Sequence, residues 1–408
     1  MSTAPVDCAF ATALPKIELH AHLTGSISRA CLHDIWVQKT ARGDSLQLED
    51  PLDAIPSHKV DYDIKTYGLH SLTFPSANLS FDTSPLVSCT KFSDPVMKLP
   101  ATPIGLLRHA HCSSSTSLTN TNLRFFPLFS SYIYKLCNDL ASVEYSTERV
   151  LQDFQSDGVV YLELRTTPRS TPDQSASKDQ YVNTVLGVLR KHNDRLSSTM
   201  QAFLILSIDR RNTPAEAKEV VDLAIKYQKS GVVGIDLCGN PAVGDVRIFS
   251  KAFSRAKTAG LKITLHFAEI AESATDLELQ TLLSWQPDRL GHVIHVKDEF
   301  QKTIQRQDIA VELCLSCNVH AKMITGTYPD HHFGMWRHTA VPVILCTDDV
   351  GVFCSPLSQE YYLAAQHFGL NREQIRSMCE RAIDAIFAGP EQQSRLRKIY
   401  SEWDVCSS

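Results

Sequence analysis

Short hydrophobic runs alternate with longer amphipathic stretches along most of the chain, and this alternation predicts repeated strand–helix units. The run that starts at Lys16 alternates apolar and polar positions with a period of two, as expected for a strand. Later runs such as Val341–Cys346 are almost continuously apolar, which is typical of parallel strands covered on both faces. In total the pattern predicts eight strands, at 16–22, 159–165, 201–208, 232–238, 262–267, 289–293, 310–315 and 341–346.

Helices are predicted between these strands, because apolar residues recur there every three or four positions. They are expected at 28–39, 128–140, 147–156, 178–196, 214–230, 244–260, 275–283, 299–306, 356–368 and 372–403, and Asp157–Gly158 is expected to end the third of them. Repeated βα units of this number predict a closed (β/α)8 barrel of the TIM type, formed by residues 1–408 as a single domain. An open, doubly wound sheet is the alternative.

The pattern degrades between residues 41 and 124. Seven prolines interrupt this stretch from position 51 to 103, and Ser113–Ser117 is of low complexity. Long structureless stretches are uncommon within compact domains. We therefore interpret 41–124 as an irregular or disordered insertion between the first and second barrel strands.

Polar residues collect at the carboxyl ends of the predicted strands, where such barrels carry their active sites. His20 and His22 are two positions apart on one strand, so both imidazoles point to the same side and can each offer a nitrogen to a zinc-like ion. The same letters recur at His109–His111, but no strand-like alternation leads into that copy, and we interpret it as chance. Other strand ends contribute Arg165–Arg169, Asp209, Gly239, His266, Glu269, His292, Asp348 and Asp349.

The chemistry of these side chains suggests roles for them. His20, His22, His266 and one aspartate supply three nitrogens and one oxygen, which leaves a position open for water, and a bound divalent ion lowers the pKa of that water to about 7. Glu269 follows His266 by three residues and is free to handle a proton, while His292 could take or hold the proton of the attacking water. Asp348 and Asp349 are adjacent on a strand end, so one can bind metal while the other meets the substrate.

The motifs H-x-H, H-x-x-E, G-H and T-D-D, in this order, resemble those of the adenosine deaminase family of metal-dependent hydrolases. The resemblance covers residues 14–40 and about 125–400. It implies one zinc ion per chain and Glu269 as the proton donor to the purine ring nitrogen beside the reacting carbon. It implies His292 on the attacking water, Asp349 and the backbone of Gly239 on the purine, and as metal ligands His20, His22, His266 and Asp348.

Within the family, the chain is similar to the adenosine deaminase-like proteins that hydrolyse N6-methyl-AMP to IMP and methylamine. Arg165–Arg169 resembles their second-strand motif, and its hydroxyls and guanidinium can hold a phosphate by charge-assisted hydrogen bonds. Ile208–Arg211 and His331–Trp336 also resemble that group. The substrate-binding residues expected on this basis are His22, Thr24, Tyr134, Thr166, Thr167, Pro168, Arg169, Asp209, Gly239 and Asp349. Helix capping or a solvated surface is the alternative for the arginines.

The sequence departs from the family at four places. Residues 41–124 do not match the segment that covers the site in relatives. The histidine that relatives place on the substrate is absent from this sequence, and Tyr134 aligns nearest to its position. Thr24 replaces the usual Asn or Asp, and Val293 replaces the usual Gly. Two other functions therefore stay open, namely a deaminase of free adenosine and a catalytically impaired homologue that only binds.

Composition narrows the possible partners. The net charge of −5 and pI near 6.3 argue against a nucleic-acid binder. The sequence contains no run of 18 apolar residues, so we expect no membrane span. The first residues lack a secretory signal, so we interpret the twelve cysteines as reduced thiols of a cytosolic protein. Cys314–Cys317 forms a CxxC across the end of the seventh predicted strand and is expected to be two packed thiols. We expect a monomer that binds a small purine nucleotide.

Overall fold

The computed structural model describes residues 4–44, 46–63, 123–172 and 175–403. All of these belong to one compact unit of the chain. The predictions for His109–His111 and Ser113–Ser117 lie outside the described residues.

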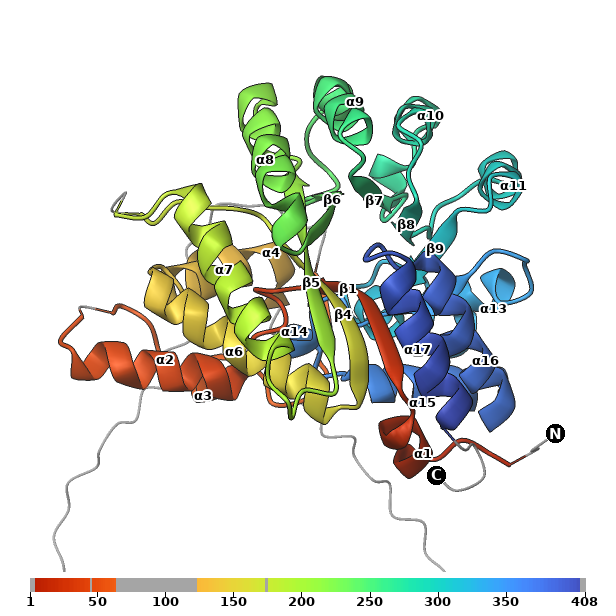
Figure 1. The fold of residues 1–408 in the computed structure, drawn as a ribbon, viewed down its shortest axis with the longest axis horizontal. Helices are drawn as coiled ribbons and strands as arrows, with labels where there is room; N and C mark the ends of the chain where they lie inside the picture. Colours follow the sequence, from red (N-terminus) through yellow and green to blue (C-terminus); the bar gives the residue numbers. More distant parts are fainter. Residues whose placement is uncertain (1–3, 45, 64–122, 173–174, 404–408) are drawn as a thin grey trace, which may run out of the picture. The chain divides into compact units, whose positions relative to one another are not determined.

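Eight parallel strands form one sheet around the centre of this unit (Figure 1). Each strand pairs with the next one along the sheet, and the strands are β1 (Lys16–His22), β4 (Val159–Thr166), β5 (Gln201–Asp209), β6 (Val232–Cys238), β7 (Lys262–Phe267), β8 (Arg289–His292), β9 (Ala310–Leu313) and β10 (Val343–Leu345). The sheet nearly closes where the ends of β1 and β10 meet. There the His22 amide donates to the Asp348 carbonyl at 3.0 Å, and the Asp348 amide donates to the His20 carbonyl at 2.8 Å. The predicted TIM-type (β/α)8 barrel is confirmed.

Helices connect successive strands on the outside of the barrel (Figure 1). Several begin at a side-chain cap: Ser177 accepts from the Gln180 amide at the start of α7, and Thr213 accepts from the Glu216 amide at the start of α8, where Pro214 fits the first turn. The principal helices are α2 (Arg29–Ala41), α6 (Leu140–Ser156), α7 (Lys178–Asn193), α8 (Pro214–Tyr227), α9 (Ser250–Thr258), α10 (Asp276–Ser284), α11 (Asp298–Arg306), α15 (Leu357–Phe368), α16 (Arg372–Ala382) and α17 (Pro390–Glu402). Shorter helices are α1 (Cys8–Ala13), α3 (Pro51–Ala54), α4 (Phe125–Leu128), α5 (Tyr134–Leu136), α12 (Leu315–His320), α13 (Phe333–Trp336) and α14 (Val350–Phe353).

Several predicted helices have different bounds. The helix expected at 128–140 is α4, a π-helix at Phe129–Ile133 and α5, and it ends at Leu136. The helix expected at 244–260 is a 3-10 turn at Val246–Phe249 followed by α9. The helix expected at 147–156 begins at Leu140, because Asp139 caps it by accepting from the Ser142 amide at 2.7 Å. The segment 372–403 is two helices rather than one, since a 3-10 turn at Ile383–Ala385 and Gly389, with a φ of 85°, separate them. The predicted stop at Gly158 is confirmed: its φ is 79°, and a Cβ there would lie 2.5 Å from the carbonyl oxygen of Thr12.

Part of the stretch predicted as an irregular insertion packs beside the first barrel helix. Trp36 of α2 donates to the carbonyl of Leu48 at 3.0 Å, and Ile55 and Tyr62 are buried. The two-residue strands β2 (Tyr62–Asp63) and β3 (Leu123–Arg124) pair in parallel where the described chain resumes. Residues 64–122 of the predicted insertion lie outside the described residues.

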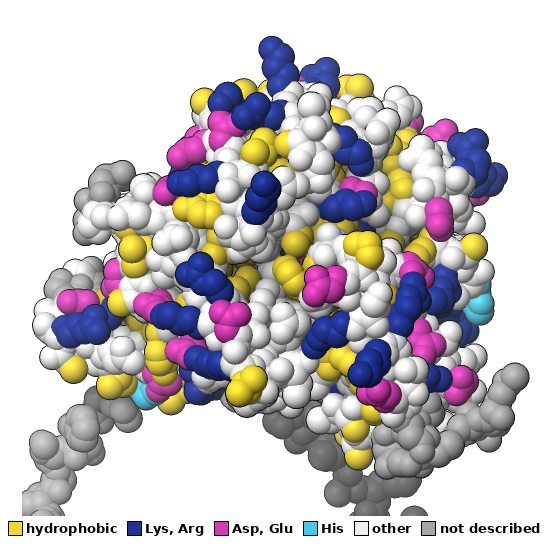
Figure 2. Space-filling view, in the orientation of Figure 1, with side chains coloured by type: hydrophobic (Ala, Val, Ile, Leu, Met, Phe, Trp, Pro, Cys, Tyr) yellow, Lys and Arg dark blue, Asp and Glu magenta, His cyan; other side chains and the backbone are white. Residues whose placement is uncertain are grey.

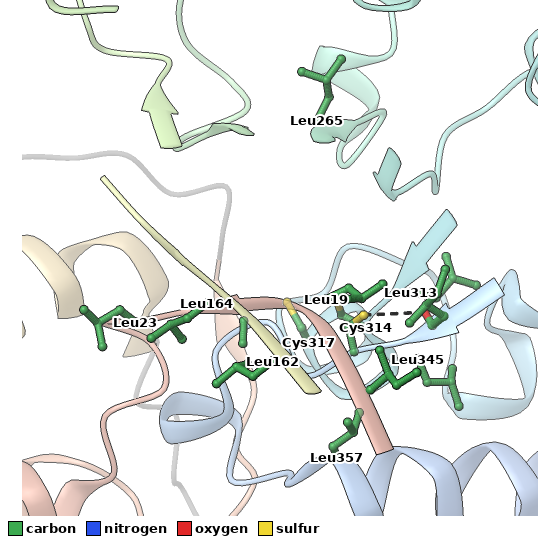
Figure 3. Packing of buried hydrophobic residues seen from close by; sticks show 14 of the residues in the cluster. Leu19, Leu23, Leu162, Leu164, Leu265, Leu313, Cys314, Cys317, Leu345 and Leu357 are labelled. Atoms are coloured by element: carbon green, nitrogen blue, oxygen red, sulfur yellow. Dashed lines mark hydrogen bonds between the residues drawn. The ribbon is translucent and has the colours of Figure 1, made fainter. Parts of the chain in front are cut away.

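Leucines from different strands pack together in the buried core (Figure 3). Leu19 of β1, Leu164 of β4, Leu313 of β9 and Leu345 of β10 are fully buried. Each such side chain contributes about 1.5–3 kcal/mol relative to an exposed one. This packing holds the strand ends, and therefore the site residues on them, in fixed positions.

Charged side chains of both signs are interspersed on the face of the molecule shown in Figure 2, without a patch of one sign. Among the described residues, no helix combines the length and apolarity needed to cross a bilayer.

Candidate active site

Three imidazoles and one carboxylate converge at the ends of β1 and β7 and just after β10. The Nε2 atom of His266 lies 3.2 Å from Nε2 of His20 and 3.1 Å from Nε2 of His22. Asp348 Oδ1 lies 3.6 Å from Nε2 of His20 and 3.4 Å from Nε2 of His22. Ring nitrogens and a carboxylate oxygen that converge this closely form a ligand set that a cation would satisfy.

Buried carboxylates set the protonation of two of these rings. His20 Nδ1 lies 2.9 Å from Oε2 of Glu312, and His266 Nδ1 lies 3.1 Å from Oδ1 of Asp236. A carboxylate only accepts, so both rings carry their proton on Nδ1 and present the lone pair of Nε2 to the cluster. The residues therefore fit a divalent ion bound by nitrogen and oxygen.

His292 lies at the edge of the same cluster. One ligand atom each from His20, His266, His292 and Asp348 can be chosen so that all lie within 4.8 Å of one another. Nε2 of His292 is 3.7 Å from Oδ2 of Asp348 and 3.9 Å from Oε1 of Glu269, and this nitrogen has no hydrogen-bond partner among the described residues. Geometry alone thus leaves either His22 or His292 as the third nitrogen ligand.

Glu269 is a buried carboxyl group poised to carry a proton. It is 6% exposed, and its Oε2 has no hydrogen-bond partner in the described part of the chain. Burial raises the pKa of Glu269 to about 7, with a smaller contribution from the charge of Asp348 against a lowering by His266. A carboxyl group with such a pKa is partly protonated at neutral pH and can act as a general acid.

The adjacent aspartates face different ways, as the sequence predicts. Asp348, with a φ of 61°, turns its carboxylate to the histidines. Asp349 packs on Gly25 instead, where a Cβ would lie 1.5 Å from Oδ1 of Asp349. Burial, followed by the charges of Asp348 and Glu269, raises the pKa of Asp349 well above its usual range, which favours the protonated form that can donate a hydrogen bond.

Gly239 and Asp209 lie side by side at the ends of β6 and β5. Gly239 has a φ of 93°, and a Cβ there would lie 2.7 Å from Oδ1 of Asp209. Arg211 donates three hydrogen bonds to the Asp209 carboxylate. Its backbone amide and Nε are both 2.8 Å from Oδ1, and its Nη2 is 2.6 Å from Oδ2.

The motif after β4 divides between two environments. The Thr166 hydroxyl is 2.6 Å from the Tyr181 hydroxyl of α7 and is buried. Thr167 is half-buried beside Cys238, with Oγ1 3.6 Å from Sγ. Arg169 lies between the rings of Tyr134 and Tyr181, 4.9 and 5.0 Å from their centroids, and donates to the Cys137 carbonyl at 3.2 Å. Pro168, between Thr167 and Arg169, is buried, and Thr24, two residues after His22, is half-buried.

A buried ion network beneath the histidines was not foreseen from the sequence. Arg165 donates to Glu312, lies 3.4 Å from Asp236 and donates to the Leu19 carbonyl at 2.8 Å. Arg289 donates from Nε to Oε1 of Glu312 at 2.5 Å and from Nη2 to Oε2 of Glu163 at 2.6 Å. All five side chains are fully buried. The signal was present: these charged residues lie inside otherwise apolar strands, two of them in β4, and such residues are rarely buried unless they are paired.

The CxxC does not lie across a strand end as predicted. Strand β9 ends at Leu313, and Cys314 is the residue before α12, which contains Cys317. Both thiols are fully buried, and burial raises the pKa of each well above its usual range. They behave as packed side chains, as expected, because reactive cysteines need access and a lowered pKa.

Comparison with known proteins identifies the family. The family model described as adenosine deaminase matches residues 96–403. The chain belongs to the adenosine deaminase family. It is therefore a hydrolytic deaminase of a metal-dependent family, and its buried His/Asp cluster is a site that could bind the metal.

Relatives within this family cover nearly the whole chain. N6-Methyl-AMP deaminase of Homo sapiens is 31% identical over 97% of this chain and 95% of its own length. N6-Methyl-AMP deaminase-L of Xenopus laevis is 37% identical over 94% of this chain and 92% of its own length. The crystal structure of Arabidopsis N6-mAMP deaminase is 32% identical, with a TM-score of 0.75 over 97% of this chain and 100% of that one. Arabidopsis ADAL complexed with IMP is also 32% identical, with a TM-score of 0.73 over 96% of this chain and 97% of that one.

Proposed function

We propose that this deaminase hydrolyses N6-methyl-AMP, with water, to IMP and methylamine. The observation that carries the proposal is the acid beside the donor cluster: Glu269, with its pKa near 7, lies against His292 and close to the converging Nε2 atoms. Family membership and relatives that are named for this activity support it. A free-adenosine deaminase is the second candidate.

The proposed metal is one zinc ion per chain, held by His20, His22, His266 and Asp348. Zinc suits three imidazoles and a carboxylate with one open position, and it supplies hydroxide at neutral pH when bound. Glu312 and Asp236 keep two of the rings turned with Nε2 toward it.

The remaining side chains of the site act on the purine and on the water. Glu269 donates its proton to the ring nitrogen beside the reacting carbon, which leaves that carbon more electrophilic. His292 holds the attacking water, and the protonated Asp349 donates to the purine while the backbone of Gly239 contacts it. The oxygen of the water bonds to the reacting carbon, and the bond from this carbon to the methylamino nitrogen breaks. One proton of the water leaves on methylamine, and the other returns Glu269 to its acid form.

Specificity for a monophosphate is proposed to rest on the motif after β4. Thr167 and Arg169 would bind the phosphate by charge-assisted hydrogen bonds. Pro168 lies between them, and Thr166 precedes them at the end of β4. Tyr134 and Tyr181 hold the Arg169 guanidinium in place. Thr24 and Asp209 complete the proposed substrate contacts, together with His22.

We further propose that residues 1–408 act as a single deaminase domain, monomeric and cytosolic. The experiment that tests the function is incubation of the zinc-loaded protein with N6-methyl-AMP, AMP and adenosine in separate reactions, followed by chromatography. IMP from the methylated monophosphate and little product from the others is the expected result. Inosine from adenosine alone would favour the second candidate, and no product from any with zinc bound would indicate an impaired homologue.

A further inference from the structure

We infer that His331, acting through Asn318, is a positioning residue that fixes the tautomer of His292, so that His292 presents an N–H and not a lone pair to the reacting centre. No contact of either residue with substrate is required. The inference rests on the direction of three consecutive hydrogen bonds that lead away from the site.

The first bond has a polarity that cannot be reversed. The backbone amide of Phe333 lies 3.0 Å from Nδ1 of His331, and a backbone N–H only donates. Nδ1 of His331 must therefore accept, which places the proton of this neutral ring on Nε2. Burial lowers the pKa of His331 well below its usual range, which agrees with a neutral ring.

The second and third bonds transmit this direction to His292. Nε2 of His331 lies 3.0 Å from Oδ1 of Asn318, and Nδ2 of Asn318 lies 3.0 Å from Nδ1 of His292. Because the His331 N–H must meet an acceptor, the amide oxygen of Asn318 faces His331 and its NH2 group faces His292. Nδ1 of His292 then accepts, and its proton is on Nε2.

Two neighbouring contacts hold the relay in this orientation. Nδ2 of Asn318 also lies 3.4 Å from Sδ of Met323. The thioether sulfur is a weak acceptor, so it favours the NH2 group at this position over the amide oxygen. The His332 ring, stacked on His331 with centroids 4.1 Å apart, donates to the His292 carbonyl at 2.6 Å. His292 and Asn318 are fully buried and His331 is 2% exposed, so water does not compete for these bonds.

The consequence is a division of labour among the histidines. Carboxylates turn the lone pairs of His20 and His266 toward the cluster, whereas an amide turns an N–H of His292 toward Oδ2 of Asp348 and Oε1 of Glu269. A ring nitrogen that carries a proton is not a metal ligand. The relay therefore selects His22, and not His292, as the third nitrogen ligand, and it makes His292 a hydrogen-bond donor to the attacking oxygen.

The direct test is the nitrogen spectrum of the zinc-loaded protein labelled with 15N-histidine, in which the His292 signals are assigned by their loss in His292→Gln. The relay predicts a neutral ring protonated on Nε2. A ring protonated on Nδ1, or on both nitrogens, would overturn it. This measurement does not depend on the substrate, so it is informative even when the proposed activity fails.

The kinetic test, which rests on the proposed function, compares two side chains of similar length at position 331. Gln can still donate to Asn318, whereas Met cannot, so His331→Gln is expected to keep kcat within about threefold and His331→Met to lower it at least about tenfold. KM and zinc content are expected to stay unchanged in both. Equal kcat in the two variants would show that the relay does not act on the reaction. Absence of IMP from the native protein would refute the proposed activity and not the tautomer.

Discussion

At the scale of single residues, burial decides the chemistry more than charge does. Glu269 and Asp349 are both carboxyl groups withdrawn from water, so their pKa values rise and they become donors. Arg165 is equally buried, but two carboxylates surround it and it stays an ion pair. The sequence identifies these residues, and the packing assigns what each can do.

Replacing Glu269 by Gln removes the acid and keeps the shape. We expect kcat for N6-methyl-AMP to fall by about 10²- to 10⁴-fold, which is the range for a lost general acid, while the zinc content measured by mass spectrometry stays at one per chain. The exposed Glu299→Gln serves as the matched control and should be silent. Near-normal turnover by the Glu269 variant would remove this residue from the mechanism.

Replacing Arg169 by Ala tests the phosphate contact. A charge-assisted hydrogen bond contributes about 1.5–3 kcal/mol, so KM for N6-methyl-AMP should rise by roughly 10- to 100-fold. Any activity on adenosine, which lacks the phosphate, should not change. Arg195, exposed and paired with Glu148, provides the control substitution. If both substrates lose activity equally, Arg169 only supports Tyr134 and the surrounding loop.

At the scale of elements, strand and helix identities follow from the sequence, because hydrophobic periodicity is a local property. All eight predicted strands are present within a few residues. The motifs at the ends of β1 and β7 were equally visible, since His20 and His22, like His266 and Glu269, are near neighbours in sequence. The Glu312 and Asn318 partners were not visible, because they contact histidines of other strands and only the closed barrel brings them together.

The G-H motif on β8 carries a steric prediction. A Cβ at Gly291 would lie 2.6 Å from Cε1 of His20, so Gly291→Ala must displace that ring from Glu312. We expect zinc affinity to fall by about 10- to 100-fold, as for loss of a metal-orienting contact. Gly187→Ala in α7, where nothing lies within 4 Å, is the matched control and should keep full affinity. Competition with a chelating dye measures both, and equal affinities would contradict the close packing.

At the scale of the whole molecule, the donor cluster joins strands from opposite ends of the chain. β1 supplies two histidines, and the segment after β10 supplies Asp348. An ion bound to these side chains would connect the first and last strands of the barrel. Hydrophobic periodicity alone does not specify that these two strands meet, so the prediction of this cluster depended on the closed barrel and on the resemblance to the family.

Zinc should therefore stabilise the fold. The size of this stabilisation in two variants distinguishes a ligand set with His22 from one with His292. At a free zinc concentration 100 times Kd, binding adds about 2.7 kcal/mol to the free energy of unfolding. In thermal unfolding experiments we expect this increase in Tm to be lost in His22→Asn and retained in His292→Asn. The opposite pattern would place His292 among the ligands and exclude His22.

The central claim is that one metal ion at this cluster supports deamination of N6-methyl-AMP. The most direct measurement strips the protein of metal, restores zinc in steps, and follows IMP and methylamine at each step. We predict that both products form in equal amounts and that the rate rises until one zinc ion per chain is bound. A rate that is independent of zinc, or IMP formed without methylamine, would contradict the account.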